Sequence, residues 1–177
     1  AISGVTMPYY VNELYGNAWS LGLIMGSFGA AAVTGTLLYS WFGDKISRRW
    51  VFIIGYIIVG LRSVFMILYP PLAGMIVIAI VAGLAAGPIN PIVGVLWYER
   101  IPNHMRARVF SLTSAGFLIA MPIGALLAGY LLEWVGLTNS LIIYGVIYFL
   151  ATGSLIFNPT ANELEREMVI TEDIERL

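Results

Sequence analysis

Residues 18–42 read AWSLGLIMGSFGAAAVTGTLLYSWF, a run without a charged side chain, and residues 43–49, GDKISRR, follow it. A transmembrane helix needs about 20 mostly apolar residues, because the hydrocarbon core is about 30 Å thick and each residue rises 1.5 Å. The first stretch is therefore long enough to cross a bilayer. The second adds three cations and one carboxylate at its end. Together they predict a membrane-spanning helix followed by a basic loop.

Four further apolar runs of comparable length follow this one along the chain, at 50–69, 72–98, 109–132 and 139–157. The opening segment 1–14 is also apolar, but it contains Pro8 and is too short to cross a bilayer. It lacks a basic start and a leading Met, so we do not expect a signal peptide. We interpret it as the last part of a helix that begins outside this sequence.

The composition of the chain agrees with a polytopic membrane protein. Of its 177 residues, 59% are hydrophobic and 11% are charged, whereas about a quarter of a soluble domain is charged. A net charge of −1 gives no electrostatic footprint for nucleic acid. The absence of Cys excludes disulfides, thiol nucleophiles and Cys-based zinc sites. We predict an all-α bundle of transmembrane helices over residues 1–157.

Lysine and arginine in the short loops predict the orientation, because these residues resist translocation. Loop 43–49 holds Lys45, Arg48 and Arg49, and segment 99–108 holds Arg100, Arg106 and Arg108. The alternate connections at 12–17, 69–71 and 133–138 hold none. Both basic loops are therefore predicted to be cytoplasmic. The acidic tail 158–177 then lies in the cytoplasm, as a solvated extension or a short helix.

The interior of the predicted spans contains no Asp, Glu or His. Membrane proteases, metal-dependent membrane enzymes and carboxylate proton relays need such groups at depth. The single His104 falls in a basic loop. We therefore expect no enzyme, no metal site and no cofactor.

Arg62 is the one charged residue within a predicted span, about twelve residues into its helix. Placing an arginine at that depth costs about 2.5–3.5 kcal/mol, so we expect a compensating role. One interpretation is a group that attracts an anion or contacts substrate in a wet cavity. The other is an arginine that snorkels past Tyr69 to water or pairs with a carbonyl.

Small residues and prolines mark where helices pack closely or bend. Gly22 and Gly26, and Gly83 and Gly87, have the four-residue spacing that lets two helix backbones approach. Prolines at 88 and 91 flank Asn90 and leave nearby carbonyls without their helical partners. This stretch therefore predicts either a kink that lines a cavity or a purely structural bend.

Loop 40–49, SWFGDKISRR, resembles the signature loop of the major facilitator superfamily, Gly-x-x-x-Asp-(Arg/Lys)-x-Gly-(Arg/Lys)-(Arg/Lys). Serines at 40 and 47 replace the two glycines of that pattern. The segment 101–111 is similar to the loop before the penultimate helix of these transporters. The stretches GPINP at 87–91 and PIG at 122–124 resemble macrolide-type and multidrug exporters. The motif residues that match the family are Asp44, Lys45, Arg48 and Arg49.

The resemblance implies that the five spans are helices eight to twelve of twelve and that 1–14 is the remnant of helix seven. In this family two six-helix halves enclose the substrate site, and rocking of the halves alternates access. Helices seven, eight, ten and eleven line the cavity, so Arg62 on helix nine becomes a weaker candidate. The matched motif would form a cytoplasmic gate. The possible cavity residues are then Ser27, Thr34, Asn90, Met121 and Arg62.

We therefore expect the second half of a secondary transporter in the cell membrane that exports amphipathic small molecules or drugs. The alternatives are a transporter of a specific polar metabolite and a membrane scaffold subunit that transports nothing. The expected partners are a small-molecule substrate, the lipid bilayer and a missing N-terminal six-helix half. If a proton is the coupling ion, its titrating group lies in that missing half, because this half offers none.

Overall fold

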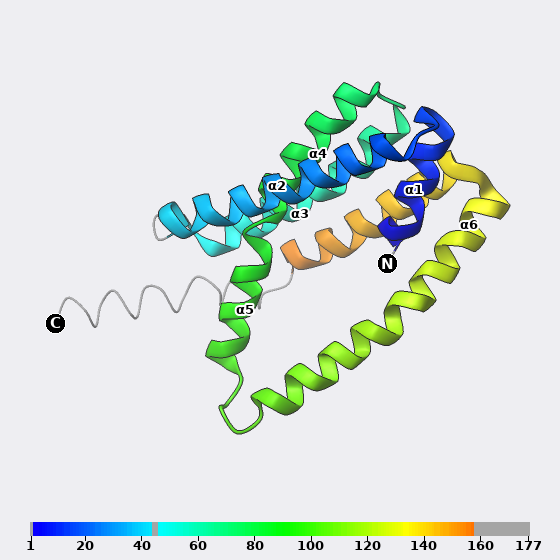
Figure 1. Cartoon of the computed structure of the whole chain (residues 1–177). Coiled ribbons are helices and arrows are strands. Elements are labelled where there is room, and N and C mark those ends of the chain that lie inside the picture. Colours follow the sequence, from blue (N-terminus) through cyan, green and yellow to red (C-terminus); the bar gives the residue numbers. More distant parts are fainter. Residues whose placement is uncertain (1, 44–45, 158–177) are drawn as a thin grey trace.

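A computed structural model of the chain describes residues 2–43 and 46–157. The predicted gate residues Asp44 and Lys45 and the predicted tail 158–177 lie outside the described residues. Every regular element in the described part is an α-helix, as expected for an all-α bundle (Figure 1). In chain order the helices are α1 (Ile2–Tyr15), α2 (Ala18–Phe42), α3 (Arg48–Ile67), α4 (Leu72–Ala86), α5 (Ile89–Arg100) and α6 (Arg106–Phe157).

The ends of α2 and α3 follow from local backbone chemistry. The side chain of Asn17 caps α2 by accepting a hydrogen bond from the backbone N–H of Ser20, at 2.8 Å. After α3, Tyr69 adopts a left-handed backbone with φ of 46°, which is uncommon for a residue with a side chain. Pro70 and Pro71 follow it and prevent the helix from continuing. The chain therefore reverses between α3 and α4 within a few residues.

The apolar run expected at 72–98 divides into α4 and α5 at Gly87 and Pro88. The physical reason is that Pro91 has no N–H to donate to the carbonyl of Gly87, four residues earlier. The hydroxyl of Thr36 in α2 lies 2.9 Å from that carbonyl and also 2.9 Å from the carbonyl of Ala32 in its own helix, so the two acceptors share its one proton. Thus a side chain from another helix partly satisfies the backbone group that the proline leaves free.

The runs expected at 109–132 and 139–157 are both contained in α6. Only Gly136 departs from helical geometry, with φ of 78° and ψ of 172°. A glycine adopts such a positive φ without steric cost. The connection expected at 133–138 is therefore reduced to one non-helical residue. The two arms of α6 point in different directions, and the second returns beside α3 (Figure 1).

Helices α2 and α4 pack closely through small residues. A Cβ atom on Gly83 would lie 2.9 Å from the Cβ of Ala31, and one on Gly87 would lie 2.7 Å from the backbone N of Thr36. The expectation of close packing is confirmed for this pair. At Gly22 and Gly26 nothing in the described part lies within 4 Å of a Cβ, so close packing at these two positions stays a prediction.

Three tyrosines join helices at one end of the bundle, and we call Tyr10, Tyr15 and Tyr69 the tyrosine cluster. The rings of Tyr10 and Tyr69 stack at 6.0 Å between centroids. The hydroxyls of Tyr10 and Tyr15 donate to the carbonyls of Met66, at 3.1 Å, and Pro70, at 2.6 Å. The Tyr69 hydroxyl lies 2.6 Å from that of Thr138, just after the bend of α6. The cluster thus connects α1, the α3–α4 turn and the second arm of α6.

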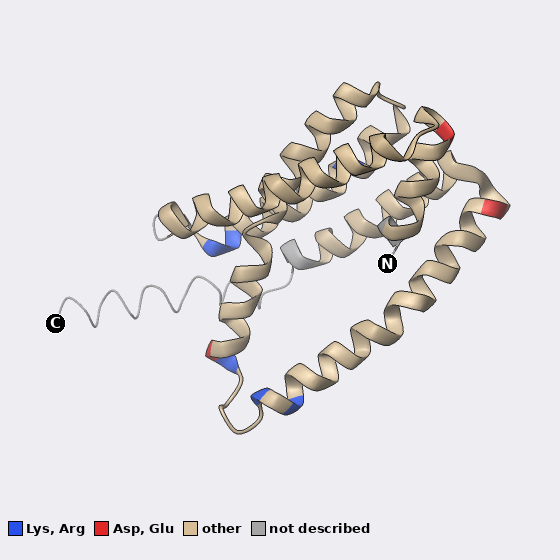
Figure 2. Ribbon diagram, in the orientation of Figure 1, with Lys and Arg blue, Asp and Glu red and all other residues tan. Residues whose placement is uncertain are grey.

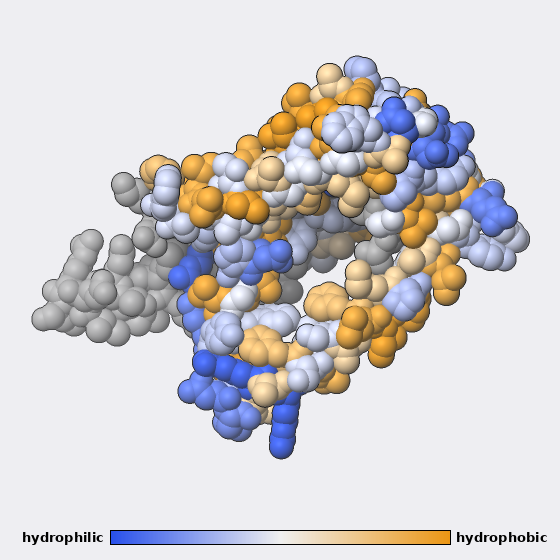
Figure 3. All heavy atoms as spheres, viewed as in Figure 1, coloured by the Kyte–Doolittle hydropathy of each residue, from blue (hydrophilic) through white to orange (hydrophobic). Residues whose placement is uncertain are grey.

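Much of the apolar surface faces outward rather than into a core. Four helical stretches in the described part are long and apolar enough to cross a membrane, namely Ala18–Phe42, Arg48–Ile67, Leu72–Arg100 and Arg106–Ser154. In the last of these, only 11% of the most apolar window is buried. Figure 3 shows hydrophobic atoms along the outer sides of α4 and α6. Such a surface is compatible with lipid or a further protein layer, not with water.

We predict that Gly87→Ala destabilises the fold by about 1–3 kcal/mol, because its methyl group would overlap the backbone of α2. Thermal unfolding in detergent measures the change. Gly145→Ala is the matched control, since a Cβ there meets nothing within 4 Å. Equal melting temperatures for the two variants would contradict the close approach of α2 and α4.

Candidate functional site

Apart from Arg62, the charged residues of the described part lie near helix ends or the bend of α6. Figure 2 shows Lys and Arg at the start of α3, the end of α5 and the start of α6, on one side of the view. Acidic residues near the end of α1 and the bend of α6 lie on the opposite side. The two basic segments that the sequence pointed to are therefore close to the same end of the described structure.

An ion pair joins the two basic segments. The Nη1 atom of Arg48, the first residue of α3, lies 3.1 Å from Oε1 of Glu99 near the end of α5. Arg48 is 32% exposed and Glu99 is 38% exposed. Each charge stands at the helix end where the helix dipole disfavours it, the cation at an N-terminus and the anion at a C-terminus. Contact between the two helices, rather than local helix stability, therefore accounts for this pair.

Arg106 holds the end of α5 against the start of α6. Its Nε donates to the carbonyl of Ile101 at 3.0 Å, and its Nη2 donates to the carbonyl of Tyr98 at 2.6 Å. The guanidinium carbon also lies 5.2 Å from the centroid of the Tyr98 ring. Carbonyls at the end of a helix lack their normal partners, and this arginine satisfies two acceptors there.

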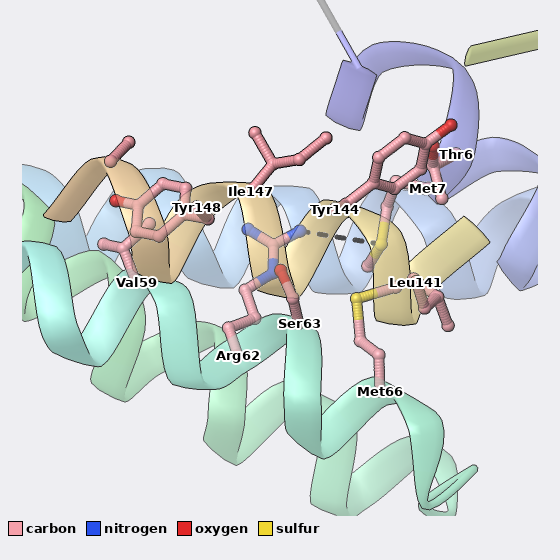
Figure 4. Close-up of a pocket in the computed structure, with 11 residues that line it drawn as sticks. Thr6, Met7, Val59, Arg62, Ser63, Met66, Leu141, Tyr144, Ile147 and Tyr148 are labelled. Carbon is pink, nitrogen blue, oxygen red and sulfur yellow. Dashed lines mark hydrogen bonds between the residues drawn. The ribbon is translucent and has the colours of Figure 1, made fainter. Parts of the chain in front are cut away.

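A second charged feature is a half-open cavity of about 260 Å³ between α1, α3 and the second arm of α6 (Figure 4). Arg62 is the charged residue that lines it, and the guanidinium group points from α3 toward α6 (Figure 4). Most of the wall is apolar. The other lining residues are Thr6, Met7, Val59, Ser63, Met66, Leu141, Tyr144, Ile147, Tyr148 and Ala151.

Within the described structure, Arg62 contacts a thioether sulfur and an aromatic ring, which are weak partners for a cation. Its Nη2 donates to the sulfur of Met7 at 3.6 Å, and its guanidinium carbon lies 5.4 Å from the ring centroid of Phe28. The described residues supply no carboxylate and no carbonyl to this guanidinium. Of the two interpretations from the sequence, the structure has the side chain in a cavity rather than extended past Tyr69.

Hydroxyl groups surround the same cavity. The Thr6 side chain is 4% exposed, and its oxygen has no hydrogen bond of good geometry in the described part of the chain. The Tyr144 hydroxyl donates to the carbonyl of Ala128 at 3.3 Å, which leaves its oxygen able to accept. Tyr148 stacks on Tyr56 at 6.2 Å. The cavity therefore combines one cation and several hydroxyls with apolar walls.

The other predicted cavity residues lie elsewhere. Ser27 is half-buried on α2, and Thr34 on the same helix is exposed and donates to its own helix at the carbonyl of Ala30, 2.9 Å away. Asn90 is exposed in the first turn of α5, and Met121 is 56% exposed on the first arm of α6. The described structure does not bring these four side chains together with Arg62, so their role stays a prediction.

Sequence reasoning missed two sets of residues. Glu99 is an acid beside a basic loop, as Asp44 is, and that parallel was a usable signal. Tyr144, Tyr148 and Ala151 recur at intervals of three or four residues, which indicates one helix face. Their meeting with Arg62 depends on the bend at Gly136, for which the sequence offered only a glycine.

A family model described as Major Facilitator Superfamily matches residues 1–168. The chain is 27% identical over 164 residues to the multidrug efflux pump Tap of Mycolicibacterium fortuitum, which covers 93% of the chain and 40% of that protein. It is 29% identical over 136 residues to the multidrug efflux pump Tap of Mycobacterium tuberculosis H37Rv, covering 77% of the chain and 32% of that protein.

A plant protein named probable anion transporter 5, from Arabidopsis thaliana, is 26% identical over 118 residues. That alignment covers 66% of the chain and 27% of the plant protein. The chain thus spans two fifths or less of the length of these curated relatives. No solved structure matches it significantly.

We predict that Arg106→Ala destabilises the α5–α6 connection by about 1–2 kcal/mol, because two hydrogen bonds from a charged group are lost. Limited proteolysis of the purified protein should show faster cleavage between 100 and 106. Arg108→Ala removes a neighbouring exposed cation and should leave the cleavage rate unchanged. Equal rates for both variants would contradict a role for Arg106 in holding this connection.

Proposed function

Because the chain belongs to the major facilitator superfamily, we propose that it forms the C-terminal half of a secondary active transporter with alternating access. It is a multi-pass membrane protein, with four stretches in the described part apolar enough to cross a bilayer. In this proposal a further six-helix half completes the substrate path. The relatives, which are more than twice as long, support that arrangement.

The proposed activity is export of amphipathic small molecules or drugs. Support comes from the relatives named multidrug efflux pumps, one of which aligns with 93% of the chain. Carboxylates are absent from the described interior of the helices, which favours apolar cargo over a small hydrophilic metabolite on this side of the path. A negative charge that binds a cationic drug would then come from the other half. A transporter, rather than an enzyme, is the function that this family supports.

The observation that carries the mechanism is the ion pair between Arg48 and Glu99. Two charges at unfavourable helix ends are held in contact at 3.1 Å, and such a local conflict is typical of a functional contact. We assign it to a cytoplasmic gate that closes when the ends of α3 and α5 approach. By the motif match, Asp44, Lys45 and Arg49 belong to the same gate.

The proposed topology has the basic loops, the acidic tail 158–177 and the C-terminus in the cytoplasm, and the protein in the cell membrane. The positive-inside rule supports it, because the basic segments share one end of the bundle (Figure 2). If a proton drives transport, its titrating carboxylate lies in the other half. Ser27, Thr34, Asn90 and Met121 remain our candidates for contacts with substrate.

A second candidate function is transport of a specific polar metabolite. Arg62 in its cavity and the relative named probable anion transporter 5 favour this candidate. A scaffold subunit that transports nothing is the third possibility, and the flux measurement below separates it from both transporters.

We predict that the full-length protein exports ethidium from energised cells and that Arg48→Glu slows this export. Reversing one charge changes the balance between gate states by about 1 kcal/mol, or about fivefold in rate. The double variant Arg48→Glu/Glu99→Arg should restore most of the rate, because the pair is re-formed with exchanged charges. Fluorescence of intracellular dye measures the export.

Arg108→Gln is the control for this experiment, because it removes a cation near the same end of the bundle without touching the pair. Absence of ethidium flux together with flux of an organic anion would favour the second candidate. Absence of flux of both compounds would favour the scaffold.

We also predict that Ile46 and His104 are reachable from the cytoplasm and Leu68 from outside. The chain has no cysteine, so Ile46→Cys, His104→Cys and Leu68→Cys each introduce one defined site in it. A membrane-impermeant maleimide on intact cells should label position 68 alone, and permeabilised cells should label all three. Labels at 46 and 104 on opposite sides of the membrane would refute the topology and the alignment behind it.

A further inference from the structure

We propose that the cavity around Arg62 binds the anionic head of a single-chain amphiphile, a carboxylate or phosphate attached to an alkyl tail. The site lies between α1, α3 and the second arm of α6, and it is distinct from the gate at Arg48 and Glu99. The inference concerns binding and holds whichever cargo the protein transports.

The first argument is the unbalanced energy of the Arg62 charge. An arginine at the centre of a span costs about 2.5–3.5 kcal/mol by the insertion scale, and this is an upper bound for Arg62, which lies between the centre and the end of α3. A cation–π contact such as that with Phe28 returns about 0.5–2 kcal/mol, and the thioether of Met7 is only a weak acceptor. The described contacts therefore leave a deficit that an anion in the cavity would remove.

The second argument is the set of hydrogen-bond donors around the cavity. The guanidinium group has five N–H donors, and its fork matches carboxylate and phosphate oxygens. Thr6, whose buried hydroxyl lacks a hydrogen bond of good geometry in the described part, and Ser63 line the same cavity. Figure 4 shows the guanidinium between the rings of Tyr144 and Tyr148, whose hydroxyls point away from it.

The third argument is the shape and depth of the cavity. Its remaining walls come from apolar side chains, including Val59, Ile147 and Ala151, and suit an alkyl chain. A volume of about 260 Å³ is below the usual ~300–1,000 Å³ of small-molecule sites, so a slender chain fits better than a bulky drug. Arg62 lies five residues, about 8 Å along the axis, before the end of α3, within reach of a lipid headgroup region.

The test uses the full-length protein in phosphatidylcholine nanodiscs and dodecanoate carrying a diazirine near the middle of its chain as the probe. After illumination, mass spectrometry should find label on the peptide around 147–151 and on that around Val59, and excess dodecanoate should suppress it. The methyl ester of the same probe has no charge and should label these peptides at least tenfold less. Equal labelling by the acid and the ester would overturn the proposal.

Variants separate charge from fold. Arg62→Gln should lower labelling by the acid at least tenfold, and Arg108→Gln should not change it. Arg62→Lys keeps the charge but loses the fork, so its labelling should lie between those of Arg62→Gln and wild type. Full labelling of Arg62→Gln would show that the charge of Arg62 does not hold the head group, and would overturn the proposal. If Arg62→Gln does not fold, the comparison of acid with ester in the wild-type protein decides the question.

The source of the anion is distinguished by the lipid of the nanodisc. Adding a small fraction of lysophosphatidylglycerol, a single-chain phosphate amphiphile, to the phosphatidylcholine nanodiscs should reduce labelling if a lipid phosphate occupies the site, and should leave it unchanged if the site takes only a carboxylate. Both results support an anionic amphiphile site. Ethidium export is measured on the same samples, so that failure of this site and failure of the proposed efflux function are seen separately.

Discussion

The hydrocarbon core supplies no hydrogen-bond partners, so every backbone N–H and C=O at that depth must find one within the protein. This constraint explains why the described part of the chain is helical almost throughout. It also explains the one place where the helical pattern is interrupted at depth. There Pro91 leaves the carbonyl of Gly87 free, and the hydroxyl of Thr36 from α2 lies 2.9 Å from it. The hydroxyl and the close glycine contacts between α2 and α4 together make the break tolerable.

The same constraint sorts the arginines into two classes. Arg48 and Arg106 lie at helix ends. Arg48 forms an ion pair with Glu99, and Arg106 donates hydrogen bonds to two backbone carbonyls. Arg62 lies along a helix and meets sulfur and an aromatic face instead. Arginines at helix ends connect neighbouring helices. An arginine within a span is instead stabilised when a negatively charged group binds beside it. We base the two proposals on these two classes, the gate on the first and the amphiphile site on the second.

The sequence predicted the elements that depend on composition and local chemistry, and missed those that depend on tertiary contact. The charge-free run at 18–42 has the bounds of α2, because length and hydropathy decide such a helix. The prolines at 88 and 91 predicted a bend, and the structure has the run divide there into α4 and α5. The single-residue bend at Gly136 was not predicted, since it depends on how the second arm of α6 packs on α3. Arg62 was found because its charge is rare at depth. Glu99, Tyr144 and Tyr148 were missed because only the folded chain brings them to their partners.

The tyrosine cluster has a mechanical consequence for the whole bundle. It fixes α1, the α3–α4 turn and the second arm of α6 together at the end opposite to the Arg48–Glu99 pair. If α3 tilts, it therefore pivots about this end. The helix has 20 residues and is about 30 Å long at 1.5 Å per residue. A tilt of about 10° around the tyrosine cluster moves the start of α3, where Arg48 lies, by about 5 Å, which is more than the distance over which an ion pair holds. A small rotation at the aromatic end thus suffices to separate charges at the other.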